Sequence, residues 1–234
     1  MLAAPARNGE KTPAPRARAG RGGWASRWRD RERATGLFGA AAALLLLSLL
    51  WPYWTIHLYA PQYPQGLAVS VYLTHAGGDV AEVDELNHYI GMAPLAEAAP
   101  VERAAGVFAA AVAALALLVV RFSGRRVPLV LAAPTILFPL IFTADLSYWL
   151  ARYGHSLSPA APIHMDAFTP VLLGQGMIAQ FRTAAALGPG FYLAAAAAVL
   201  AIWATVLRLR TCRACVLRDR CSIVCLAPRA SSAR

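Results

Sequence analysis

Charged residues are scarce in this 234-residue chain, at 15% against the roughly 25% of an average soluble domain. Hydrophobic residues make up 58% of the chain, and the mean hydropathy is +0.49. This apolar content excludes a disordered body. Cysteine is also rare, with four residues, which excludes a disulfide-rich secreted module. The chain lacks a nucleophile elbow, a phosphate-binding loop, a nucleotide fingerprint and a paired-carboxylate site, so the sequence indicates no enzyme class.

Four long apolar runs dominate the rest of the sequence. Each reaches or approaches the ~17–25 residues that a helix needs to cross a bilayer, and a chain of this size could not bury four such helices on all sides. No small-x-small cleavage site follows the first run, so we expect it to be retained and not removed as a signal peptide. The sequence therefore predicts four transmembrane helices, at residues 37–53, 104–120, 127–144 and 183–207.

The basic residues are distributed unevenly between the segments that flank these runs. Nineteen of the 22 Lys and Arg residues lie before residue 37, between 121 and 126, or after 207. The two long connections, by contrast, hold only Arg103, Arg152 and Arg182. By the positive-inside rule, this predicts a multi-pass membrane protein with both termini in the cytoplasm. The formal charge of +10 thus mostly records orientation, and without a nucleic-acid-binding fold we expect no nucleic-acid partner.

The composition divides the chain into three parts. Residues 1–35 form a Pro-, Gly- and Arg-rich tail that we expect to be disordered. Residues 36–207 form the membrane domain with its outer loops at 55–103 and 145–188, and residues 208–234 form a cysteine-containing cytoplasmic tail. The fold class expected is an all-α membrane protein that carries a small α+β periplasmic cap.

The pattern of the outer loops predicts how that cap folds. Apolar residues alternate over 67–74, Gly77-Gly78 marks a reversal, and 79–83 can return as a second strand. Asp84 can then cap a short helix that runs to Gly91. In the second loop, residues 171–181 favour an interfacial helix. We expect the two loops to pack into one cap, because an isolated hairpin is only marginally stable.

Histidine and methionine gather in the outer loops. All five histidines and three of the four methionines lie there, and imidazole with thioether is a ligand set that suits copper, especially Cu(I). The candidate ligands form two pairs in the sequence, His88 with Met92 and His164 with Met165. Asp84 and Glu85 are carboxylates that can orient a ligand histidine. The alternative is that Met92 and its neighbours form the apolar face that packs the cap.

All four cysteines fall in the last cytoplasmic segment, as Cys212, Cys215, Cys221 and Cys225. Four thiolates within so short a stretch can hold zinc or an iron–sulfur cluster. The spacing departs from the ferredoxin pattern and lacks the second knuckle of a zinc ribbon. A basic tail with free thiols is therefore the competing interpretation.

One acidic residue lies near a helix core. Asp145 is at the outer end of the third apolar run, where a carboxylate is costly unless it faces water or a partner. Arg152 lies two helical turns further on and is its candidate partner if the helix continues. The four runs contain no chain of buried His, Glu or Lys, which argues against an ion-coupled transporter.

Two stretches of the outer loops resemble a family. Residues 60–67 (APQYPQGL) and 84–92 (DELNHYIGM), together with 145–155 and 168–170, are similar to small bacterial inner-membrane proteins encoded with nitrous-oxide reductase accessory genes. The resemblance covers residues 37–207. It implies copper handling or electron supply to a periplasmic copper enzyme or its maturation proteins, and it carries over no catalytic residue.

Three functions are consistent with these observations. The first is a non-enzymatic membrane accessory protein that assists maturation, copper supply or electron supply of a periplasmic copper enzyme such as nitrous-oxide reductase. The second is an electron-transfer subunit with a metal or iron–sulfur site on the cysteine tail, and the third is a metal-free membrane scaffold.

The predicted topology has a direct test. A phosphatase that is active only in the periplasm, fused after Arg234, should show no activity, because the positive-inside rule places this end in the cytoplasm. The same reporter inserted between Pro61 and Gln62 should be active. Activity of the C-terminal fusion would overturn the topology.

Overall fold

Four long helices and a five-stranded sheet make up most of the computed structural model, which describes residues 22–124, 127–178 and 181–213. Within these ranges the long helices are α1 (Gly22–Ser48), α3 (Pro100–Val119), α4 (Val127–His155) and α5 (Pro189–Arg213). The strands are β1 (Trp54–Ala60), β2 (Tyr63–Val71), β3 (Ala76–Gly78), β4 (Gly174–Ile178) and β5 (Phe181–Leu187). A short helix, α2 (Val80–Tyr89), and the 3₁₀ turns η1 (Leu95–Glu97) and η2 (Val120–Phe122) complete the fold.

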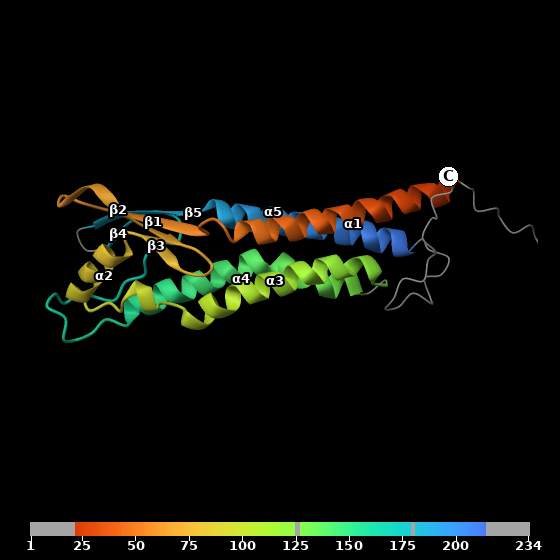
Figure 1. Cartoon of the computed structure of the whole chain (residues 1–234). Helices are drawn as coiled ribbons and strands as arrows, with labels where there is room; N and C mark the ends of the chain where they lie inside the picture. The colour runs from red at the N-terminus through yellow and green to blue at the C-terminus, as the bar shows by residue number, and fades with distance from the viewer. Residues whose placement is uncertain (1–21, 125–126, 179–180, 214–234) are drawn as a thin grey trace, which may run out of the picture.

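The long helices run side by side, and the strands and α2 gather at one end of them (Figure 1). We call this end the cap, residues 54–99 and 156–187. The first residues of α1 and the last residues of α5 lie at the opposite end of the bundle, as do the end of α3 and the start of α4. The described chain therefore enters and leaves at the same end, as the predicted topology requires.

The bundle buries small side chains and exposes large ones. Its interior is rich in alanine, with Ala113 of α3 and Ala197 and Ala201 of α5 at most 2% exposed. By contrast, Phe108 is 72% exposed, and Leu140 and Trp203 are also exposed. Small residues let helices approach closely where lipid removes the hydrophobic drive for association. Large apolar side chains over so much of the surface are typical of a face that contacts a membrane.

In the described part of the chain, three helices are long and apolar enough to cross a membrane: α3, α4 and α5. Helix α1 lies beside α5 and α3 in the same bundle, but its apolar part is short. The apolar part begins after the charged turns around Arg33 and ends with the helix at Ser48. The apolar run of the sequence continues beyond the helix, through a turn, to Tyr53. The structure thus gives three helices of membrane-spanning character where the sequence predicts four.

The sheet joins the two long connections in one structure. Its strand order is β3-β2-β1-β5-β4, and every pair is antiparallel. At the centre, Trp54 of β1 lies opposite Val71 of β2 and Leu187 of β5. One face of the sheet packs on α2 and the cap end of α4 around Trp54, Val69 and Leu146. The fold is therefore mixed α+β, with the strands of both loops in one sheet.

Several local predictions for the cap are wrong. Residues 171–181 contain strand β4 in place of a helix, because their Gly-rich segment pairs with β5, with Gly176 opposite Thr183. Residues 80–83 are the first turn of α2 and not a strand. Asp79 occupies the N-cap position that was expected for Asp84, and its carboxylate accepts a hydrogen bond from the Ala68 amide at 2.8 Å instead of capping the helix.

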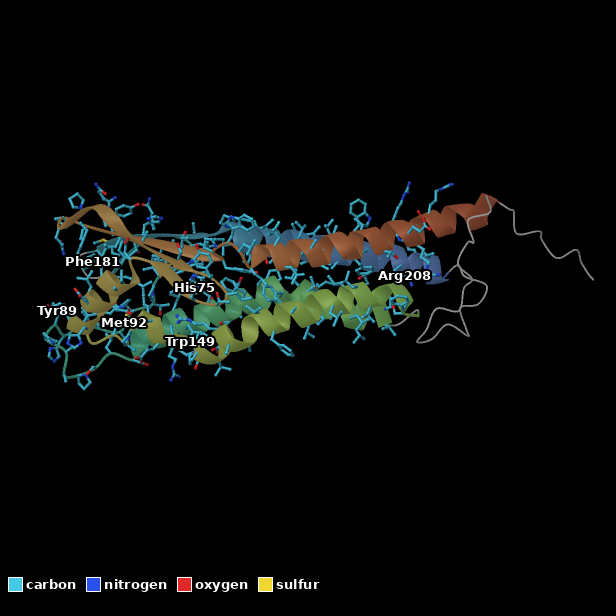
Figure 2. The ribbon with its side chains drawn as sticks, in the orientation of Figure 1. His75, Tyr89, Met92, Trp149, Phe181 and Arg208 are labelled. Atoms are coloured by element: carbon cyan, nitrogen blue, oxygen red, sulfur yellow. The ribbon has the colours of Figure 1, made fainter. Side chains whose placement is uncertain are left out.

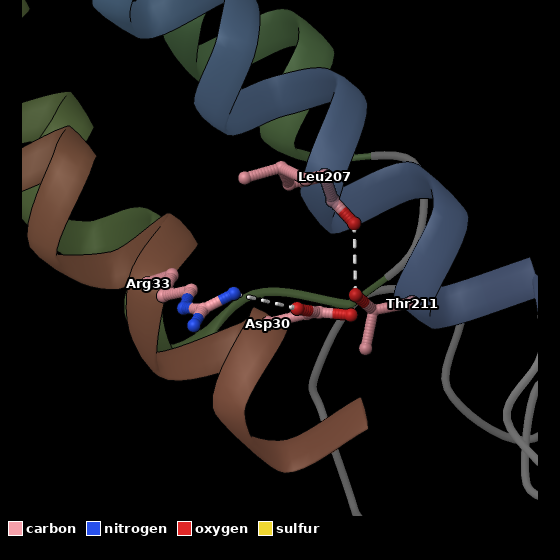
Figure 3. Close-up of polar contacts among 4 residues, drawn as sticks. All are labelled: Asp30, Arg33, Leu207 and Thr211. Carbon is pink, nitrogen blue, oxygen red and sulfur yellow. Dashed lines mark hydrogen bonds and ion pairs between the residues drawn. The ribbon is translucent and has the colours of Figure 1, made fainter. Parts of the chain in front are cut away.

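The start of α1 also differs from the expectation of a disordered tail at residues 1–35. The helix begins at Gly22, and residues 1–21 lie outside the described part of the chain. Alanine and arginine, both good helix formers, are frequent here, and a helix that continues into an apolar run is already nucleated. Asp30 and Arg33 add an exposed ion pair at 3.7 Å on this turn, near the last turns of α5 (Figure 3).

Two glycines in helices provide a matched test of this packing. A Cβ on Gly154 of α4 would lie 1.9 Å from the carbonyl oxygen of Phe168, whereas a Cβ on Gly39 of α1 would meet nothing within 4 Å. We expect Gly154→Ala to lower the thermal unfolding temperature of the detergent-purified protein, with a loss of about 1–3 kcal/mol from overpacking. Gly39→Ala should leave it unchanged or raise it slightly, because alanine favours helix. Equal melting temperatures for the two variants would contradict the contact between α4 and residue 168.

Candidate functional site

The cap contains a partly open apolar cavity of about 310 Å³. Its walls come from the sheet, from α2, from the segment around η1 and from the cap end of α4, and they include Trp54, Val83, Leu95 and Leu146. Figure 2 shows Tyr89 and Met92 toward the tip of the cap and Trp149 of α4 farther from the tip. All three line the cavity. The volume falls at the lower end of the range of small-molecule sites, roughly 300–1,000 Å³.

The stretches on which the family resemblance rests meet around this cavity. Gln62 comes from the first stretch, and the second supplies a group on and after α2 that includes Asn87 and Met92. The other loop supplies Trp149 from α4 and Pro170 from the segment before β4. These residues are up to about a hundred positions apart in the sequence, and the sheet brings them to one place.

Two carboxylates lie among the polar residues of the lining, which also include Gln62, Asn87 and Arg103. Glu102 lies in the first turn of α3 and Asp145 in α4, and the two are close enough to repel each other. The Oε2 atom of Glu102 is buried and has no hydrogen-bond partner among the described residues. The indole Nε1 of Trp149 is also buried; it lies beside the Asp145 carboxyl, one turn away on α4, without reaching the geometry of a full hydrogen bond. A buried acceptor and a buried donor are thus left to be satisfied within an apolar cavity.

The predicted pairing of Asp145 with Arg152 is not found. Helix α4 continues to His155, but seven residues along a helix separate the two Cα atoms by about 10 Å. Instead, Arg152 Nη1 donates to the Tyr148 hydroxyl at 3.1 Å, and the guanidinium lies 5.7 Å from the centre of the Trp149 ring. Asp145 faces Glu102, a residue that the sequence analysis did not select.

The structure places the two candidate copper pairs in adjacent segments. The Ile163 amide donates to the Tyr89 carbonyl at 3.0 Å, and the Ser158 amide donates to the Gly91 carbonyl at 2.8 Å. His88 directly precedes Tyr89 in the sequence, and His164 directly follows Ile163. Both histidines are exposed. Met92 and Met165 are partly buried, and Met92 lines the cavity.

No group of three or more His, Cys, Asp or Glu residues with metal-binding geometry occurs in the described ranges. The His–Met pairs fall outside such groups, because methionine is not one of these four residue types. Of the cysteines, Cys212 lies in the last turn of α5, and Cys215, Cys221 and Cys225 lie outside the described residues.

Asp84 has a structural contact in place of the expected role beside a histidine. Its carboxylate accepts hydrogen bonds from the amides of Leu95, at 2.6 Å, and Ala96, at 3.1 Å. Arg103 donates to the carbonyls of the same two residues, at 2.8 and 2.7 Å. Asp84 and Arg103 together fix the turn η1, which forms part of the cavity wall. Glu85, the next residue along α2, is exposed.

Sequence reasoning missed Glu102, which carries the unpaired oxygen. An acidic residue in the first turn of a helix is ordinary, because it interacts favourably with the helix dipole, so this position gives no signal by itself. What distinguishes Glu102 is the neighbouring helix, which brings Asp145 near enough to interact with it electrostatically. Only the packing of α3 on α4 shows this.

Comparison with known proteins gives no relative: no protein-family model matches the chain, and no curated protein matches it.

The contact between Asp84 and η1 predicts a local change on mutation. Asp84→Ala should raise the hydrogen-exchange rates of the Leu95 and Ala96 amides by about tenfold or more, since hydrogen bonds to charged groups are worth roughly 1.5–3 kcal/mol. Glu85→Ala, one residue along, is the control and should leave both rates unchanged. Exchange measured by NMR or mass spectrometry tests this, and equal rates in the two variants would contradict it.

Proposed function

We propose that this chain is a four-span protein of the bacterial inner membrane, with both termini in the cytoplasm and the cap in the periplasm. The exposed apolar surfaces of α3, α4 and α5 support membrane insertion. The position of α1 alongside α5 and α3 supports a fourth span. Among the described residues, Arg33 of α1 and Arg210 of α5 belong to the parts of these helices that lie far from the cap, which supports the orientation.

Within that membrane the protein serves as a non-enzymatic accessory protein. It assists maturation, copper supply or electron supply of a periplasmic copper enzyme such as nitrous-oxide reductase. The observation that carries this proposal is the convergence of the family-like stretches and of both His–Met pairs on the same part of the cap. A cap fixed on a membrane bundle and facing the periplasm is suited to present a site to a soluble partner.

Copper transfer is the chemistry that these residues favour. The hydrogen bond between Ile163 and Tyr89 holds the segments of His88 and His164 together. Imidazole and thioether ligands favour Cu(I). Because both histidines are exposed, a partner docked on the cap has access to the ion. The part-buried sulfurs of Met92 and Met165 would complete the ligand set.

Copper binding is tested on the detergent-purified protein with a chelator that competes for Cu(I). The wild-type protein should bind one Cu(I) per chain. Loss of an outer-shell partner already costs roughly 10–100-fold in metal affinity, so His88→Ala and His164→Ala should each weaken binding by at least that factor. His57→Ala removes another exposed histidine, on β1, and should have no effect.

Two results would reject this proposal. Binding that His57→Ala weakens as much as His88→Ala does would show adventitious histidine coordination. In cells, a deletion strain that retains full nitrous-oxide reductase activity and copper content would exclude the accessory role, whatever the protein binds in vitro.

A further inference from the structure

We infer that the cap cavity binds a membrane-soluble aromatic compound that carries a hydroxyl group, the chemistry of a quinol. This inference goes beyond the accessory role and does not depend on copper. The cavity is lined mainly by aliphatic and aromatic side chains, among them Trp54, Phe142 and Phe168. Such a lining favours an apolar ring over a polar metabolite, because burying an unpaired polar group costs free energy.

The unsatisfied atoms of the lining select the polar group of the ligand. The Oε2 atom of Glu102 needs a donor, and the Nε1 of Trp149 is a donor without a full hydrogen bond. Both residues line the same cavity as Asp145, whose carboxyl lies beside the Trp149 indole and is near enough to Glu102 to interact electrostatically. A hydroxyl group can donate to the first atom and accept from the second. An ammonium group can only donate, and an ether can only accept.

The position of these carboxylates indicates where the ligand comes from. Glu102 is in the first turn of α3, and Asp145 is in the cap half of α4, so both lie where candidate spans meet the cap. Beside them, Val101 and Phe108 of α3 are 72% exposed and apolar. A compound dissolved in the outer part of the bilayer therefore lies at the level of the polar end of the cavity.

A matched pair of ligands tests the hydroxyl without altering the protein. Equilibrium dialysis of the detergent-purified, copper-free protein, with protein-free micelles as the blank, compares 1-naphthol with 1-methoxynaphthalene. The two share a ring system, but only the naphthol can donate a hydrogen bond. A hydrogen bond to a charged group is worth about ten- to a hundredfold in affinity, so the naphthol should bind at least tenfold more tightly than the ether.

A matched pair of variants then locates the acceptor. Glu102→Leu should remove the preference for naphthol over the ether while retaining ring binding. Glu82→Leu, an exposed glutamate in the first turn of α2, should keep the preference. If Glu102→Leu fails to fold, the ligand pair on the wild-type protein still decides the question.

With this ligand pair, three outcomes would overturn the inference: equal affinity for naphthol and ether in the wild-type protein, no binding of either, or a preference retained in Glu102→Leu. Tighter binding of octylammonium than of naphthol would also overturn it, since the two carboxylates would then form a site for a lipophilic cation. Copper is absent from every arm, so failure here leaves the copper proposal intact, and failure of copper binding leaves this inference intact.

Discussion

The antiparallel pairing of β1 with β5 is the interaction on which both halves of the molecule depend. Five residues connect α1 to β1, and one residue connects β5 to α5. The register between β1 and β5 therefore fixes α1 and α5 next to each other. The contacts continue beyond the strands, where the Gly188 amide donates to the Tyr53 carbonyl at 2.8 Å and the Gly190 amide donates to the Pro52 carbonyl at 2.9 Å. Gly188 permits this approach, because a Cβ there would lie 2.2 Å from Pro52 O. One ladder thus ties the sheet to the bundle.

The apolar runs predicted where the long helices lie but not their bounds, since α1 begins at Gly22, before its run, and residues 183–187 of the fourth run belong to β5. Most of the sheet was not predictable. Strand β5 reads FRTAAAL, an alanine-rich segment with helical propensity that forms a strand because β1 and β4 pair with it on both sides. Strand β1 was missed for a related reason. Its first residue, Trp54, belongs to an aromatic cluster typical of a membrane interface, yet it is buried and donates to the Leu172 carbonyl at 2.6 Å. Pairing with distant segments decides both strands, and no local pattern encodes it.

The residues of the candidate site also divide into those that the sequence could select and those that only the packing shows. The His–Met pairs could be selected from residue type, and the structure brings their segments together through a backbone hydrogen bond that the sequence does not reveal. Asp84 could be selected as a carboxylate close to His88, but its two oxygens are taken by backbone amides eleven and twelve residues further on. Glu102 gave no signal, since its significance lies in Asp145 on another helix. Residue chemistry predicts which atoms are able to react, and packing decides which of them remain unsatisfied.

Met92 belongs to both parts of this site. It is a candidate copper ligand, and it also lines the cavity whose polar end lies at Glu102. If its sulfur coordinates an ion beside the exposed histidines, the side chain loses part of its packing against a ring bound in the cavity, and this loss costs free energy. Coupling between two ligands is reciprocal. If an aromatic ligand displaces Met92 and thereby changes the affinity for Cu(I), Cu(I) must change the affinity for the aromatic ligand by the same factor. An unchanged Cu(I) affinity in the presence of naphthol would instead place copper on the exposed histidines alone, with Met92 a part of the cavity wall.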